Sequence, residues 1–379
     1  MSRRPRILEV VFAPNWGGLE MLALSFAEYF TWKGCPVTVA ALPGSPLATR
    51  AKQAGITLET MQPHWTYADI FTARRLGRII REQKIDIVHA HVSRDLSTLT
   101  LALKFAGRGR LILTQHMDFH RNKKDVFHRW VYSQLEHVVT LTEGMRENHL
   151  RYTPITEDRV STIYNGVHLP EPTDGVHAVR QQWGLQQDDI VVGMMGRLDR
   201  TKRQDLLLQA AAPLAEQYPN MHMLIMGNEA PTASGRGYEA ELRQLAEQSG
   251  LANRCRFTGF IEHGADAMAA IDILAHPTPS ESFGLVLAEA MAQSKPVVAS
   301  RAGGALEIVA DGETGILCEP LNVEAFRGAL VKILEDANMR SRMGQAGRER
   351  VERLFSYDNM MDQYLQLFQG VSGDPEACV

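Results

Sequence analysis

One stretch decides the fold of this chain: residues 271–291, which read IDILAHPTPSESFGLVLAEAM. Its first five residues are mostly apolar and predict a buried strand. A polar loop with Pro277 and Pro279 follows, and a helix is expected to begin near Phe283 or Gly284. A strand, a loop and a helix in this order form the repeating unit of a parallel sheet covered by helices.

The same alternation extends outward in both directions along the chain. In the N-terminal half, short apolar runs that predict strands lie at residues 7–13, 37–42, 85–89, 111–114, 137–141 and 160–164. In the C-terminal half they lie at residues 190–195, 221–226, 255–257, 271–275, 296–300 and 315–317. Most are followed by helical spacing, which is typical of α/β chains with doubly wound parallel sheets. We therefore predict two Rossmann-like domains that face each other across a cleft.

A turn signal separates the two series of strands. Asn165-Gly166 is followed closely by Pro170, Pro172, Asp174 and Gly175. The length of 379 residues accommodates two domains. We place an N-terminal domain at residues 1–167 and a C-terminal domain at 168–355. The small and polar residues 371–379 are expected to form a frayed tail.

The net charge of -4 conceals a difference between the two halves. Residues 1–165 hold 22 Lys and Arg against 15 Asp and Glu, a net charge of +7. The remaining residues hold 18 against 29, a net charge of -11. The chain as a whole is therefore not basic, and we expect no nucleic-acid partner.

Several other classes of protein are also disfavoured. The cysteines, at positions 35, 255, 318 and 378, are far apart, so neither a disulfide framework nor a structural zinc site is indicated. Apolar runs of 18 or more residues are absent from the sequence, so we expect no membrane-spanning helix. The N-terminus has no long apolar run of the kind that marks a signal peptide. We expect a cytoplasmic protein.

The opening stretch also carries candidate ligand-binding groups. A helix start at Gly284 offers free N–H groups to an anion, and the glycine admits close approach of a ligand. Glu289, about one and a half turns into the helix, can accept two hydrogen bonds from a vicinal diol such as a ribose. Glu281, before the helix, can reach a sugar hydroxyl. The alternative is that Glu281 stabilises the helix start and Glu289 lies on a solvated face.

A cationic loop follows the strand at residues 190–195. It reads Gly196-Arg197-Leu198-Asp199-Arg200-Thr201-Lys202-Arg203 and places four cations in seven residues before a helix. A helix start disfavours cations, so this loop points to a bound anion such as a diphosphate, held by Arg197 and Lys202. The alternative is a solvated turn in which Asp199 pairs with a cation.

The N-terminal half offers a glycine turn and a group of histidines. Gly17 and Gly18 follow the first strand, where they admit phosphate or sugar to the backbone. Eight of the 13 histidines precede residue 165. A histidine at the end of a strand is more often structural, but His116 follows a strand whose neighbours also end in polar loops and is the better candidate for the cleft. His91 lies near the end of another strand. Converging carboxylates or thiolates are not apparent, so we expect no metal site.

Three smaller turns complete the candidate set. They contain Gly227 after one strand, Phe260 after another, and Gly303-Gly304 after a third. Phe260 is suited to backbone contact with a flat base. Each turn, taken alone, could also be only a loop.

The order of these motifs resembles the retaining GT-B glycosyltransferases of the GT4 class. The resemblance covers roughly residues 6–370. It is carried by Gly17-Gly18-x-Glu20, His116, Asn165-Gly166-Val167, Gly196-Arg197-x4-Lys202 and Glu281-x7-Glu289. The chain departs from the pattern at His168, where the family usually has Asp, and at Gly227-Asn228-Glu229, where it has Gly-x-Gly. Both departures bear on the donor's base and sugar, not on the reaction class.

The resemblance implies roles for these residues. Arg197 and Lys202 would hold the donor diphosphate, Glu289 the ribose and Glu281 the sugar hydroxyls. Phe260 would contact the base, Gly18 would lie against the sugar or diphosphate, and His116 would sit by the reacting centre. The expected catalytic residues are His116, Glu281, Arg197 and Lys202. The expected donor-binding residues are Gly17, Gly18, Arg197, Lys202, Gly227, Phe260, Ser282, Phe283, Gly284, Leu285 and Glu289, with Glu20 and His91 on the acceptor side. A helix at about 356–370 would pack back on the first domain.

These inferences predict a retaining transferase that moves a sugar from a nucleoside-diphosphate sugar, with UDP favoured over GDP. The acceptor would be a glycan or lipid-linked molecule in cell-surface polysaccharide or glycolipid biosynthesis. No cofactor or metal is required, because two cations can stabilise the leaving diphosphate. The alternatives are a UDP-sugar epimerase or phosphorylase-like enzyme of the same architecture and a non-catalytic nucleotide-sugar sensor.

The basic N-terminal domain suggests one further partner. Five cations lie on one helical stretch, at positions 74, 75, 78, 81 and 84, and residues 121–132 interleave cations with aromatics. Such a face suits an anionic membrane surface or a lipid-linked acceptor. A solvated face with aromatics that point into the core is the alternative. The protein would then be cytoplasmic or peripheral at the inner face of a membrane.

Overall fold

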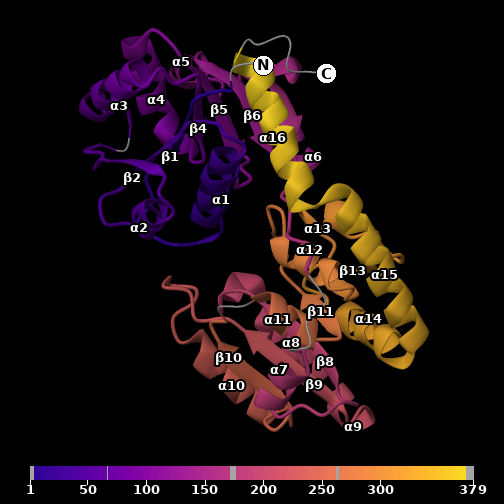
Figure 1. Cartoon of the computed structure of the whole chain (residues 1–379). Helices are drawn as coiled ribbons and strands as arrows, with labels where there is room; N and C mark the ends of the chain where they lie inside the picture. Colours follow the sequence, from indigo (N-terminus) through magenta and orange to yellow (C-terminus); the bar gives the residue numbers. More distant parts are fainter. Residues whose placement is uncertain (1–3, 66, 171–175, 262–263, 373–379) are drawn as a thin grey trace. The chain divides into compact units, whose positions relative to one another are not determined.

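The computed structural model describes residues 4–65, 67–170, 176–261 and 264–372. The chain divides into two compact units (Figure 1). Unit 1 consists of Met1–Tyr164 with Met360–Val379, and unit 2 of Asn165–Asn359. The predicted boundaries, after residues 167 and 355, lie three and four residues from these. Pro172, Asp174 and Gly175 of the predicted turn lie outside the described residues.

Unit 1 is built on a seven-stranded sheet in the order β3-β2-β1-β4-β5-β6-β7. Its strands are β1 (Ile7–Val11), β2 (Val37–Ala41), β3 (Thr57–Thr60), β4 (Ile87–Ala90), β5 (Arg110–Gln115), β6 (Leu135–Thr140) and β7 (Val160–Thr162). All the pairings are parallel, so each connection crosses over the sheet. The register sets Glu9 of β1 beside His89 of β4.

The crossovers of unit 1 are helical. They are α1 (Gly18–Trp32), α2 (Pro46–Gln53), α3 (Ile70–Glu82), η1 (Ser93–Asp95), α4 (Leu96–Ala106), α5 (Val126–Tyr132), α6 (Glu143–Tyr152) and η2 (Glu157–Arg159). Local sequence sets their ends. The carboxylate of Asp69 accepts the backbone N–H groups of Phe71 and Thr72 at the start of α3, and Gly107 ends α4 with a φ of 68°.

The closing helix, α16 (Tyr357–Ser372), packs on unit 1 from Met360 onward. Tyr364 and Phe368 are fully buried, and the Tyr364 ring meets that of Phe26 edge-on at 4.6 Å between centroids. Its hydroxyl lies 3.0 Å from that of Thr114 on β5. The helix includes Val371 and Ser372, so the expected tail is two residues shorter than predicted. Residues 373–379 lie outside the described residues.

Unit 2 is built on a six-stranded parallel sheet in the order β10-β9-β8-β11-β12-β13. Its strands are β8 (Ile190–Met195), β9 (Met221–Met226), β10 (Cys255–Gly259), β11 (Ile273–His276), β12 (Val297–Ser300) and β13 (Gly315–Cys318). Its helices are α7 (Val176–Gln182), η3 (Arg200–Lys202), α8 (Gln204–Ala211), α9 (Leu214–Gln217), α10 (Tyr238–Gln248), α11 (Gly264–Ala270), α12 (Leu285–Ala292), α13 (Ala305–Ile308), α14 (Val323–Glu335) and α15 (Ala337–Leu354). Buried Leu, Ile, Val and Met from strands and helices form one core cluster.

Both sheets are doubly wound, as the sequence predicted. Every predicted strand lies within two residues of its expected bounds, and the structure adds β3. The strand order reverses between β1 and β4 in unit 1 and between β8 and β11 in unit 2. In open α/β sheets, ligands bind at the carboxyl ends of the strands at such a switch point. These two places therefore position the candidate site residues of each unit.

Candidate functional site

The switch point of unit 2 brings together two of the predicted catalytic residues. Lys202 lies in η3, after β8, and Glu281 lies in the loop after β11. The Lys202 ammonium (Nζ) is 2.7 Å from Glu281 Oε2. His276, the last residue of β11, adds its Nε2 at 3.3 Å from the same oxygen. His276 is buried, and sequence reasoning missed it because the predicted strand ended one residue earlier.

This environment keeps the Glu281 carboxylate ionised. Burial raises the pKa of Glu281, but His276 and the charge of Lys202 outweigh it and bring the value to about 2. At neutral pH the carboxylate therefore carries its charge and can only accept hydrogen bonds. The Lys202 ammonium has three N–H groups, so it can donate to Glu281 and still offer protons to a second anion.

The Gly303-Gly304 turn, after β12, packs against the backbone of the Glu281 segment. The N–H of Gly304 donates to the Glu281 carbonyl at 2.9 Å. A Cβ at Gly303 would stand 2.0 Å from the Glu281 carbonyl oxygen, and one at Gly304 would stand 2.0 Å from that of Phe283. The two glycines are thus required because backbone packs on backbone there. Their turn positions Glu281 instead of facing a ligand.

Only one of the four cations in the loop after β8 lacks a carboxylate partner among the described residues. Arg200 pairs with Glu241, Arg203 with Asp205, and Lys202 with Glu281. The Arg197 side chain is exposed, and no described residue is paired with its guanidinium. As far as the described residues go, the loop therefore presents one unpaired cation, beside a Lys202 that is paired with Glu281.

Asp199 fixes the shape of this loop. Its carboxylate accepts hydrogen bonds from the hydroxyls of Thr201 at 2.7 Å, Thr232 at 3.0 Å and Ser234 at 2.8 Å. Burial raises the pKa of Asp199, but these hydrogen bonds outweigh it and hold the value well below the usual range. The predicted alternative, in which Asp199 pairs with a cation of the loop, is wrong.

The helix start after Glu281 has the predicted form. Gly284 is the N-cap of α12 with a φ of 97°, which favours glycine. Leu285 begins the helix, Ser282 is half-buried, and the Phe283 ring packs edge-on against Phe355 at 6.0 Å. The first N–H groups of α12 point out of the helix start and are available to an anion. Glu289 lies on the exposed side of α12, and its carboxylate has no partner among the described residues.

Two predicted donor-binding residues serve the packing of strand ends. A Cβ at Gly227 would stand 2.0 Å from the Gly196 carbonyl oxygen, so neighbouring backbone fills the space expected for a ligand. The Phe260 N–H donates to Asn228 Oδ1 at 2.8 Å, and the residue is 73 % exposed. The Phe260 N–H is therefore already engaged, and the predicted backbone contact with a base stays a prediction.

The two glycines of the turn in unit 1, Gly17 and Gly18, have different surroundings. Glu20, in the first turn of α1, is buried, and its Oε2 lies 3.4 Å from where a Cβ at Gly17 would stand. A Cβ at Gly18 would meet nothing within 4 Å. Gly17 therefore leaves room for Glu20, whereas Gly18 adjoins open space that can admit a ligand.

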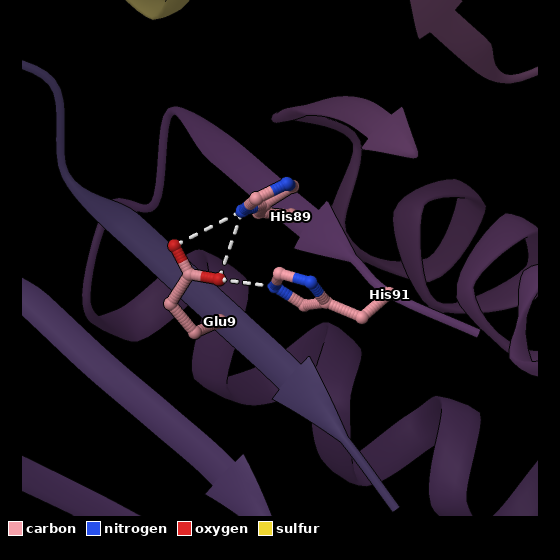
Figure 2. Close-up of side chains that lie close together, drawn as sticks. All are labelled: Glu9, His89 and His91. Atoms are coloured by element: carbon pink, nitrogen blue, oxygen red, sulfur yellow. Dashed lines mark hydrogen bonds and ion pairs between the residues drawn. The ribbon is translucent and has the colours of Figure 1, made fainter. Parts of the chain in front are cut away.

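A buried hydrogen-bond network joins His116 to the centre of the unit 1 sheet. Figure 2 shows the carboxylate of Glu9, on β1, facing both His89 and His91. Glu9 Oε2 lies 2.8 Å from His91 Nε2 and 2.9 Å from His89 Nδ1. His91 Nδ1 lies 3.0 Å from His116 Nε2. His89 Nε2 lies 2.8 Å from the Thr114 hydroxyl, which contacts Tyr364 of α16.

This network fixes the proton positions on His91 and His116. Burial raises the pKa of Glu9, but the two histidines outweigh it and lower the value, so the carboxylate is ionised and only accepts. Burial and His89 lower the pKa of His91 to about 4, so His91 is neutral at pH 7. Its Nε2–H donates to Glu9, and its Nδ1 must accept from His116 Nε2–H. Burial, with His91 and His89, also holds the pKa of His116 well below its usual value.

His116 is therefore a neutral imidazole whose Nδ1 is a hydrogen-bond acceptor. Sequence reasoning identified His116 and His91 but missed Glu9. The signal was present, because an acidic side chain inside a buried strand requires a partner.

The expectation that no carboxylate converges on the histidines is wrong. Ligand atoms of Glu9, His89 and His91 all lie within 4.8 Å of one another, a set that could hold a metal ion. The nitrogens that face the carboxylate are already hydrogen-bonded to it. Glu9 therefore accepts hydrogen bonds from both histidines.

Comparisons with known proteins match both units. The family model described as "Glycosyl transferases group 1" matches residues 176–350, and the one described as "Glycosyltransferase Family 4" matches residues 16–170. The first match contains Arg197, Lys202, Glu281 and Glu289, and the second contains Gly18, His91 and His116.

Curated relatives carry glycosyltransferase names. The chain is 33% identical over 224 residues to a D-inositol 3-phosphate glycosyltransferase of Corynebacterium urealyticum, a match that covers 58% of this chain and 53% of that protein. The chain thus spans about half the length of this and similar relatives. It is 26% identical to a GDP-mannose-dependent monoacylated alpha-(1-6)-phosphatidylinositol monomannoside mannosyltransferase of Corynebacterium glutamicum, over 97% of this chain and 98% of that one.

Solved structures share the fold across both units. A glycosyltransferase from Rickettsia africae matches with a TM-score of 0.88 and 21% identity, over 98% of this chain and 99% of that one. Anabaena HepE in complex with UDP and glucose matches with a TM-score of 0.82 and 23% identity, over 97% of this chain and 100% of that one. Among the described residues, no helix has the length and apolar character needed to cross a membrane. With the two family models spanning most of its length, the chain belongs to the group 1, family 4 glycosyltransferases of GT-B fold.

Proposed function

We propose that this protein transfers a sugar from a nucleoside-diphosphate sugar to a glycan or lipid-linked acceptor, with retention at the anomeric carbon. The observation that carries the proposal is the grouping of Lys202, Glu281 and His276 at the switch point of unit 2, in a loop pair that also presents an unpaired Arg197. A cation and an ionised acceptor side by side suit a ligand with a diphosphate next to hydroxyls.

The chemistry of the site follows from these charges. As the bond to the sugar breaks, negative charge grows on the leaving diphosphate. Arg197, the remaining N–H groups of Lys202 and the start of α12 stabilise this charge. Glu281 orients the sugar by accepting hydrogen bonds from its hydroxyls, and Glu289 accepts hydrogen bonds from the two ribose hydroxyls. In unit 1, His116 offers Nδ1 as an acceptor to a substrate hydroxyl.

We expect no metal requirement, because the cations of the loop can stabilise the diphosphate. Activity should therefore persist in EDTA. A loss of activity in EDTA that added Mg²⁺ restores would contradict this part of the proposal.

The identity of the nucleotide base in the donor, uracil or guanine, is a separate proposal. The sequence favours UDP, and the structural neighbour HepE was solved with UDP. The relative that matches along the whole chain is named for GDP-mannose. We therefore propose UDP-sugars and GDP-mannose as the donors to test.

The test is a donor screen on the full chain. UDP-glucose, UDP-galactose, UDP-N-acetylglucosamine and GDP-mannose are each incubated with the protein, and release of UDP or GDP is measured. Slow donor hydrolysis without acceptor supports an enzyme, and the anomeric configuration of the released sugar, read early by NMR, tests retention. Binding without any turnover would favour a sensor, and an epimerised donor would favour an epimerase.

A further inference from the structure

The backbone and the side-chain stem of Glu281 are both held in place. Its carbonyl accepts the N–H of Gly304 at 2.9 Å. A Cβ at Gly284, the N-cap of α12, would stand 3.2 Å from Glu281 Cγ, so the glycine leaves room for the glutamate side chain. The remaining freedom of Glu281 therefore lies in the orientation of its carboxylate.

The two oxygens of this carboxylate differ in their contacts. Oε2 lies 2.7 Å from the Lys202 ammonium and 3.3 Å from His276 Nε2. Oε1 has no hydrogen-bond or ion-pair partner among the residues that the structure describes, and 18 % of the Glu281 side chain is exposed. Both protein partners therefore lie on one oxygen, and the other oxygen is left for a ligand.

The two partners of Oε2 differ in rigidity. Lys202 reaches it from η3 through a flexible four-carbon chain that is 25 % exposed. His276 is the last residue of β11, a strand with neighbours on both sides in the sheet, and is only 3 % exposed. A packed side chain on an inner strand is held more precisely than one on a loop. His276 is therefore the contact that can fix the plane of the carboxylate.

The position of the proton on His276 follows from its surroundings. Both ring nitrogens are buried without a well-aligned hydrogen-bond partner among the described residues, but Nε2 has the Glu281 carboxylate at 3.3 Å. A proton on Nδ1 would be a buried N–H without an acceptor, which is costly. The proton therefore belongs on Nε2, where it faces Oε2. Such a contact can shorten when a ligand binds, as hydrogen bonds in unliganded sites often do.

We propose that His276 is a positioning residue that holds Oε2 of Glu281, so that Oε1 alone faces the donor sugar and selects among its hydroxyls. One ionised oxygen can accept from one hydroxyl or from two neighbouring ones. The identity of the ligand in this inference rests on the proposed function. The restraint of Glu281 by His276 does not, and the two parts are tested separately.

The first test needs no donor. Urea unfolding is measured for His276→Leu, Glu281→Gln and the double variant of the full chain. If the side chains hold each other, the changes in the unfolding equilibrium constant should be non-additive by roughly fivefold or more. The matched control is His149→Leu, the same substitution at a buried histidine of unit 1, which should combine additively with Glu281→Gln.

The second test measures specificity. We determine kcat/KM for UDP-glucose and GDP-mannose, each beside its 2-, 3-, 4- and 6-deoxy forms. Wild type should discriminate against at least one deoxy form by about 10- to 100-fold, because that form lacks a hydrogen bond to a charged group. In His276→Leu this discrimination should fall to a few-fold. His276→Gln should restore it, because the amide N–H can reach the same oxygen, and His149→Leu should keep the wild-type ratio.

The ratio separates positioning from a merely structural role. A His276 that only supports the fold would lower kcat/KM equally for every donor and leave the discrimination unchanged. Should His276→Leu not fold, His276→Asn replaces it, because its shorter amide does not reach Oε2.

Three results would overturn the inference: additive urea effects of His276→Leu and Glu281→Gln, unchanged discrimination in His276→Leu, or equal use of all deoxy donors by wild type. The proposed function fails separately. If no nucleotide sugar is bound or consumed, the transferase is lost, and the urea cycle alone decides whether His276 restrains Glu281. If donors are consumed but the ratios do not depend on His276, only its positioning role is lost.

Discussion

Lys202 and Glu281, 79 positions apart in the sequence, form an ion pair with 2.7 Å between Nζ and Oε2. Their motifs predicted separate tasks, one on a diphosphate and one on sugar hydroxyls. In the structure the two side chains are in direct contact. Lys202 helps to keep Glu281 ionised and still has N–H groups for a second anion. A substitution at either residue should therefore change the electrostatic environment of the other.

The unpaired cation gives the first prediction. Arg197→Ala and Lys202→Ala should each lower kcat/KM for the donor by on the order of 10²–10³, as does loss of one preorganised donor in other enzymes. Steady-state kinetics measure this. Arg200→Ala is the matched control, because Arg200 lies in the same loop but is paired with Glu241. It should stay within a few-fold of wild type, and equal losses in all three variants would refute the assignment.

The Glu281 carboxylate gives the second prediction. Its folded pKa of about 2 lies below the ordinary value of 4.5, so the stability that it contributes is present above pH 4.5 and is lost as the pH falls toward 2. The full contribution is on the order of 3 kcal/mol. Glu281→Gln should flatten the loss of urea-unfolding stability between pH 5 and 3. An unchanged slope would mean that the ion pair does not hold the carboxylate ionised.

The third prediction concerns the tautomer of His116. Nitrogen-15 NMR of histidine-labelled protein should show His116 neutral at pH 6, with its proton on Nε2 and an unprotonated Nδ1. Glu9→Gln should disturb this pattern, because the amide can donate to His91 and reverse the chain of hydrogen bonds. The control is Thr114→Val, on the other branch of the network, which should leave the His116 signals in place. A charged His116 at pH 6 in wild type would contradict the proposed network.

His149 provides the fourth prediction. It is buried, neither ring nitrogen has a partner among the described residues, and burial with nearby Lys123 lowers its pKa to about 3. As the pH falls below 6.5, the unfolded chain binds a proton that the folded chain refuses, so stability is lost. His149→Leu should reduce this loss by up to about 1.4 kcal/mol per pH unit near pH 5. Urea midpoints at several pH values measure it, and the exposed His120→Leu should change nothing.

The sequence predicts most of this fold because its strands are short apolar runs that are buried in a parallel sheet. β3 escaped prediction because Thr57–Thr60 has one apolar residue and is only half-buried at the sheet edge. The contacts between the site residues could not be predicted in the same way. Glu9 meets His89 through the register of β1 and β4, and Lys202 meets Glu281 through the reversal of strand order. Neither pairing is encoded in local spacing, so only the assembled sheet shows them.

The roles of the glycines show the same limit. Gly18 and Gly227 look alike in sequence, since each follows a strand. In the structure a Cβ at Gly18 would meet open space, whereas the space beside Gly227 is occupied by the backbone of Gly196. Sequence spacing locates such turns, but it does not show what occupies the space beside them.

We propose that unit 2 binds a nucleoside diphosphate through the loop after β8. Isothermal titration of UDP and of GDP into the wild-type chain and into Arg197→Ala tests it most directly. We predict that one of the two nucleotides binds wild type and that Arg197→Ala weakens it at least tenfold, while Arg200→Ala does not. Binding of neither nucleotide, or equal affinity in wild type and Arg197→Ala, would contradict the claim.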